Sequence, residues 1–250
     1  MKNRKETVYR IAGFVFSIGG ARVGGILLSS LTFPYILRVL GVDGFGSWAY
    51  VLALVAFFEL LANPGISVYA QREFAVLRGD AGTLISQIFS IRLVLSIFVG
   101  VLLIAFALLV ESNAILRSLI FLYGVPMLLL SSLSCNDILV ANEEFHWSSA
   151  QQFVGQASNT VLIFSFIHKP EDIYLLVGFA ALTTLLSLMV GWIKLWRMGF
   201  RLKFTIEFSE WVKIIKRSIS YGVASLMSQL YTRSGHLFVK WWLGETALGL

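Results

Sequence analysis

Five ionisable residues lie inside apolar stretches long enough to cross a lipid bilayer: Arg22, Glu59, Arg92, Arg233 and His236. An ionisable side chain at bilayer depth costs roughly 2.5–3.5 kcal/mol on insertion scales, so it normally faces a partner or a polar pathway. Arginine suits anionic ligands of the phosphate type, because its planar guanidinium donates two parallel hydrogen bonds. We therefore take these five residues as candidate substrate-binding residues.

Arg22 lies about the middle of the first apolar stretch, among the small residues of Gly19–Gly25. Small neighbours permit close helix packing or a local opening. Glu59 lies deep in the second stretch, and two interpretations of the two residues remain open. They either pair and neutralise each other, or line a pathway.

Arg233 and His236 are three residues apart, so they project from nearly the same helical face. They form either a cationic surface for an anionic ligand such as a pyrophosphate, or a snorkelling arginine beside a hydrogen-bonded histidine. Arg92 follows the start of its stretch by only eight residues, and we expect it to reach the cytoplasmic interface. Asp137 is near the end of its stretch and is expected to be interfacial.

The elements that position these residues are transmembrane helices. The composition is 57% hydrophobic and only 14% charged, whereas soluble domains run near a quarter charged. A membrane-crossing helix needs about 20 mainly apolar residues. The sequence predicts an all-α integral membrane protein, a polytopic helical bundle of about seven spans: Ile11–Leu37, Phe45–Tyr69, Leu84–Val110, Ile115–Ala141, Ser148–Ile167, Ile173–Trp196 and Ile219–Leu243.

A longer segment, Arg197–Arg217, separates the sixth span from the seventh. Within it, Trp211, Ile214 and Ile215 fall on one helical face, and a set of cations falls on the other: Lys213, Lys216 and Arg217. We expect an amphipathic helix on the cytoplasmic leaflet, near anionic lipid headgroups. The predicted organisation is a six-helix lobe (1–196), this connector (197–217) and the first transmembrane helix of an incomplete second lobe (218–250).

Basic residues are distributed unevenly over the connectors. With the N-terminus in the cytoplasm, one side holds thirteen: Lys2, Arg4, Lys5, Arg10, Arg72, Arg78, Lys194, Arg197, Arg201, Lys203, Lys213, Lys216 and Arg217. The other side holds four: Arg38, Arg117, Lys169 and Lys240. This excess predicts a cytoplasmic N-terminus. It also explains the net charge of +6, so we expect no nucleic-acid partner.

Residues that break helices interrupt several spans. Asn63-Pro64-Gly65 lies in the second span, Pro34 in the first and Pro126 in the fourth. Simple kinks are the favoured explanation for these prolines, although discontinuous helices also recur around the substrate sites of transporters.

Signatures of soluble-type enzymes are missing: the sequence has no Gly-x-Ser-x-Gly, Walker loop or His-Glu-x-x-His. The single cysteine, Cys135, supplies neither an internal disulfide nor a multi-thiolate metal site. We expect no catalytic residues, no metal and no cofactor.

Two groups of short motifs resemble the polysaccharide transporter family, the flippases of O-antigen and other lipid-linked oligosaccharides, whose superfamily also contains multidrug extruders. The first group is Arg38–Gly46, Asn63–Ser67 and Gln71–Ala75, and the second is Ser218–Gly222, Gln229–Thr232 and Leu243–Gly249. Where the family often has an aspartate four residues after Tyr231, this chain has Gly235. An acidic role there is not expected.

The resemblance implies the first lobe of a two-lobe transporter in the bacterial inner membrane, so that this chain looks like an N-terminal portion. The implied activity is flipping of an undecaprenyl-pyrophosphate-linked oligosaccharide from the cytoplasmic to the periplasmic leaflet. Arg22, Arg92 and Arg233 would then line a cationic route for the headgroup. Implied partners are membrane lipids, the lipid-linked substrate, and a polysaccharide polymerase with its chain-length regulator.

Two other functions remain open from the sequence. A cation-coupled drug extruder of the same superfamily needs membrane carboxylates, for which Glu59 is the deep candidate. A non-transporting scaffold of a glycan-assembly complex, or an embedded enzyme, is the third possibility.

Overall fold

The fold is a bundle of helices, seen in a computed structural model that describes residues 2–77, 82–200, 203–223 and 227, with only the backbone for 2–22. The described residues contain no strand. The longer helices are α1 (Lys2–Ala62), α2 (Ile66–Leu77), α3 (Gly82–Leu109), α7 (Phe145–Phe166) and α8 (Ile173–Arg197). The shorter ones are α4 (Ala114–Leu119), α5 (Val125–Ser132) and α6 (Asn136–Ala141). The all-α class expected for a membrane bundle is confirmed.

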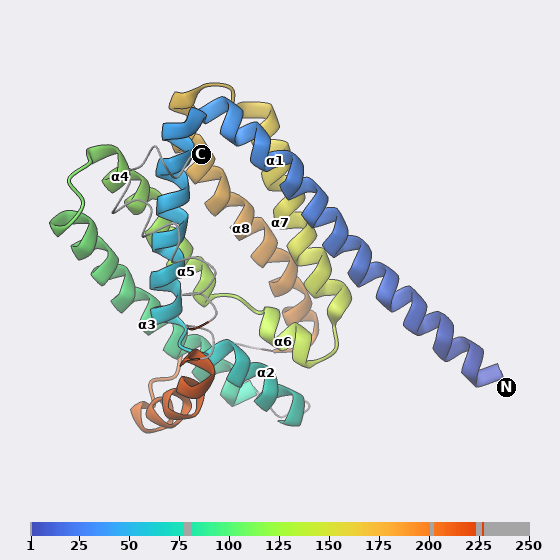
Figure 1. The fold of residues 1–250 in the computed structure, drawn as a ribbon. Coiled ribbons are helices and arrows are strands. Elements are labelled where there is room, and N and C mark those ends of the chain that lie inside the picture. The colour runs from blue at the N-terminus through green and yellow to red at the C-terminus, as the bar shows by residue number, and fades with distance from the viewer. Residues whose placement is uncertain (1, 78–81, 201–202, 224–226, 228–250) are drawn as a thin grey trace.

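Helix α1 contains the first predicted span and most of the second, because the chain turns within it at Gly41 (Figure 1). The φ of Gly41 is 69°, in the left-handed region that glycine enters without a Cβ penalty. Pro34 lies inside α1, but the non-helical backbone is at Gly41. The turn thus falls in the gap between the first two predicted spans, seven residues after Pro34.

Two further breaks divide predicted spans. Asn63-Pro64-Gly65 separates α1 from α2, with Gly65 at a φ of 78°. In the fourth predicted span, a π-helical turn (Ile120–Gly124) lies just before Pro126, and residues 133–135 separate α5 from α6. The N-terminal end of α3, the C-terminal end of α8, α2 and α6 lie at one end of the bundle (Figure 1).

Four segments among the described residues are long and apolar enough to cross a membrane: Val23–Ala62, Gly82–Leu109, Ala114–Ala141 and Pro170–Arg197. Helix α7 is the fifth predicted span and does not reach the same apolarity. Most of the seventh predicted span, including Arg233 and His236, lies outside the described residues.

The connector contains a helix over residues 208–223, which we call the connector helix. Trp211 and Ile214 are buried against α2 and α3 residues, in a cluster that includes Phe74 and Ile88. The apolar face that we expected on the leaflet therefore packs on the protein, because burial of these side chains fills the end of the bundle. A second apolar stripe on this helix stays exposed: Phe208, Val212, Ile219 and Val223.

Candidate functional site

A buried ion pair joins the third and fourth predicted spans. The guanidinium of Arg92 in α3 pairs with the carboxylate of Asp137 in α6. Arg92 is 2% exposed and Asp137 is 6% exposed. Removing one partner of such a pair leaves an uncompensated buried charge, which costs about 3–5 kcal/mol. The two residues therefore hold α3 and α6 in one arrangement.

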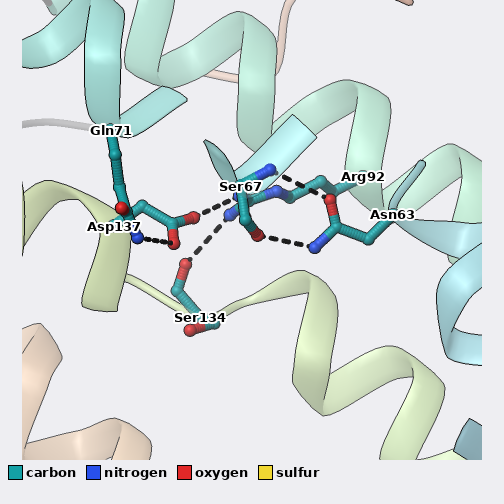
Figure 2. A network of polar contacts seen from close by, with 6 residues as sticks. All are labelled: Asn63, Ser67, Gln71, Arg92, Ser134 and Asp137. Carbon is teal, nitrogen blue, oxygen red and sulfur yellow. Dashed lines mark hydrogen bonds and ion pairs between the residues drawn. The ribbon is translucent and has the colours of Figure 1, made fainter. Parts of the chain in front are cut away.

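Arg92 also binds both helix breaks (Figure 2). Its Nη1 donates to the carbonyl of Ser134 at 3.2 Å, and its Nη2 donates to Ser67 Oγ at 2.9 Å. Ser134 lies in the break between α5 and α6, where the carbonyl has no helical partner to accept from. Ser67 lies in the first turn of α2, directly after the other break. One side chain thus ties together two discontinuous helices.

Asn63 and Gln71 complete the network. Asn63 Oδ1 accepts from the backbone N–H of Ser67 at 3.1 Å, and its Nδ2 donates to Ser67 Oγ at 2.6 Å. The first of these bonds satisfies the backbone N–H of Ser67, which has no partner within the first turn of α2. Gln71 Nε2, one turn further along α2, lies 3.4 Å from Asp137 Oδ1.

The structure corrects two sequence-based positions. We expected Arg92 to reach the cytoplasmic interface and Asp137 to be interfacial, but both are buried and paired with each other. A long cation near a helix end can snorkel to the interface. Here Arg92 instead points into the bundle. Asp137 neutralises its charge there, and the carbonyl of Ser134 accepts one of its hydrogen bonds.

The other predicted site residues are not brought to this network by the described contacts. Arg22 lies in α1, and its side chain is outside the described part. Glu59 is partly buried near the end of α1, one turn before Asn63, and has an interaction partner. Arg233 and His236 are outside the described residues.

Sequence reasoning missed the partnership of Arg92 with Asp137, although a signal existed. Consecutive spans run antiparallel, so the start of the third and the end of the fourth lie at the same membrane depth. Arg92 is near that start and Asp137 near that end. Ser67, Gln71 and Ser134 carry no such signal, because uncharged polar residues are common near span ends.

This arrangement neutralises the arginine in the state described. Among the described residues, no group of three His, Cys, Asp or Glu side chains could hold a metal ion.

Comparison with known proteins places the chain in a family. Residues 14–250 match the family of polysaccharide biosynthesis proteins. The chain belongs to that family. The match starts within α1 and includes both helix breaks, the Arg92–Asp137 pair and the connector helix. No curated protein and no solved structure matches the chain.

The family and the apolar helices together indicate a membrane protein of polysaccharide biosynthesis.

Proposed function

We propose that this chain is part of a flippase that moves an undecaprenyl-pyrophosphate-linked oligosaccharide, such as an O-antigen repeat unit, across the bacterial inner membrane. The observation that carries the proposal is the family match over nearly the whole described bundle. The buried arginine that ties two discontinuous helices supports it, because discontinuous helices recur around transporter substrate sites.

The physical problem in flipping is the headgroup. Its sugars and pyrophosphate need a polar, cationic route, while the lipid tail stays in the bilayer. Arg22 and Arg233 are the cations proposed to receive the pyrophosphate, with Glu59 and His236 beside them. Arg92 would join them when its pair with Asp137 opens, so the ion pair would separate a closed state of the lobe from an open one.

The role is transport rather than catalysis. Members of this family act as transporters, and we propose no bond-breaking step for this chain. A polysaccharide polymerase and its chain-length regulator are proposed to act on the sugar chain after it has crossed.

Surface glycan tests the proposal. In the complete protein, Arg22→Ala and Arg233→Ala should abolish surface polysaccharide at unchanged expression, because each removes a cation from the route. Arg38→Ala is the matched control, since Arg38 is exposed and lies just before the turn at Gly41. Wild-type glycan from both Arg22→Ala and Arg233→Ala would refute the proposed route.

Labelling from outside the cell tests the orientation. We propose that the N-terminus is cytoplasmic, so His168, between α7 and α8, would lie on the periplasmic side. On a Cys135→Ser background, His168→Cys should react with a membrane-impermeant thiol reagent in spheroplasts, and Lys203→Cys should not. The reverse pattern would invert the topology.

A further inference from the structure

Helix α7 presents two exposed faces of different chemistry. It has 22 residues, which at about 1.5 Å per residue is long enough to cross the apolar core of a bilayer. On one face, Gln152 is exposed and Gln156 and Asn159 are partly exposed. These amides are four and three residues apart, so they form one stripe along the helix.

The flanks of this amide stripe are fixed by packing. On one side, Thr160 hydrogen bonds Thr32 of α1 at 3.1 Å. On the other, Ser187 of α8 donates to the backbone carbonyl of Gln151 at 2.9 Å. The stripe cannot rotate toward either neighbour without breaking these contacts, so its direction is set by the fold.

The opposite face carries no amide and alternates valines with serines. Val154 and Val161 follow Gln152 and Asn159 by two residues, which is about 200° of helical rotation, and Ser158 and Ser165 lie on the same line. Val161 is 63% exposed and Val154 is 36% exposed. Lipid suits this face better than the amide stripe, because valine has no polar group to hydrate and the Ser158 hydroxyl donates within the helix, to the carbonyl of Val154.

Lipid cannot satisfy the amide stripe. Polar side chains within a membrane span face the bundle interior or a water-filled cavity, since hydrocarbon offers them no hydrogen bonds. Asn159 Oδ1 is shielded and accepts no hydrogen bond from the described residues. Among the described residues, this acceptor in the middle of α7 therefore stays without a donor.

We propose that the amide stripe of α7 lines the hydrated route and hydrogen bonds the sugar hydroxyls of the translocated headgroup. Neutral amides both donate and accept, which matches a neutral polyhydroxyl ligand, whereas the arginines match its pyrophosphate. The choice of sugar as occupant rests on the proposed function.

Cysteine accessibility in the full chain tests the stripe. Cys135, the single native cysteine, is fully buried, so Cys135→Ser provides a background for Gln152→Cys, Gln156→Cys and Asn159→Cys. In proteoliposomes, these should react with a charged, membrane-impermeant thiol reagent at least tenfold faster than Val154→Cys and Val161→Cys. Equal rates, or faster labelling of the valine positions, would overturn the hydrated face.

A second measurement tests the sugar. An undecaprenyl-pyrophosphate-linked oligosaccharide should slow labelling at Gln152→Cys and Gln156→Cys several-fold more than undecaprenyl pyrophosphate without sugar does. Equal protection by the two lipids would overturn sugar recognition by the stripe. Neither readout requires net transport. If the native protein exported no glycan while the labelling pattern stayed as expected, that result would count against the proposed function alone.

Discussion

Gly65 and Gly222 meet backbone to backbone. A Cβ on Gly65 would lie 2.3 Å from the backbone nitrogen of Gly222, and one on Gly222 would lie 2.8 Å from the carbonyl carbon of Pro64. The connector helix is thereby seated directly on the break between α1 and α2. Ser67, two residues after Gly65, binds Arg92. The connector helix and the buried ion pair thus act on the same break.

Gly65→Ala should destabilise the protein strongly. The left-handed backbone of Gly65 costs a residue with a Cβ about 1–2 kcal/mol, and the added methyl would also push against the connector helix. Unfolding in mixed detergent micelles measures the change. Gly100→Ala is the control, because that glycine has open space around its Cβ within α3 and should gain about 0.5–1 kcal/mol. Equal effects of the two variants would contradict the close contact.

Arg92→Leu should cost about 3–5 kcal/mol of unfolding free energy, because Asp137 is left as a buried unpaired charge. The double variant Arg92→Leu with Asp137→Leu should lose clearly less, since no charge remains to be buried. The double-mutant cycle, measured by the same unfolding assay, gives the coupling. If the two single losses simply add, the pair does not stabilise the fold in the way its geometry indicates.

Much of the fold follows from local sequence. The apolar lengths predicted α3 and α8, and Asn63-Pro64-Gly65 predicted the break before α2. These features depend on neighbouring residues alone, through hydrophobic length and backbone chemistry. The turn at Gly41 lies in the gap between two predicted spans for the same reason, and Pro34 lies inside α1.

The site depends on residues far apart in the chain, which local patterns do not relate. Arg92 and Asp137 are 45 residues apart, and the local sequence relates each of them only to the nearest span end. For the connector helix, the hydrophobic pattern identified an apolar face but not its partner. Protein and lipid are both apolar, so the pattern cannot tell which of them covers Trp211.

The second apolar stripe of the connector helix should lie in the leaflet, beside its cations. Nitroxide labels at Val212→Cys and Lys213→Cys, on a Cys135→Ser background, separate neighbouring faces of this helix. Val212 is 49% exposed. Its label should be more accessible to oxygen than to a polar nickel reagent, and the label at Lys213 should show the reverse, because interfacial helices bury the apolar face alone. If both labels were more accessible to the nickel reagent than to oxygen, the whole helix would lie in water.

The hydrogen bond between Thr32 and Thr160 should contribute a modest coupling between α1 and α7. Both side chains are buried and their hydroxyl oxygens lie 3.1 Å apart. Thr32→Val, Thr160→Val and the double variant form a cycle, and hydrogen bonds between membrane helices average about 0.6 kcal/mol in such cycles. Ser158→Ala provides the control, because the Ser158 hydroxyl donates within α7, to the carbonyl of Val154. Its coupling to Thr32→Val should be near zero. A coupling of the same size for both pairs would show that the cycle reports general loosening of α7 rather than this hydrogen bond.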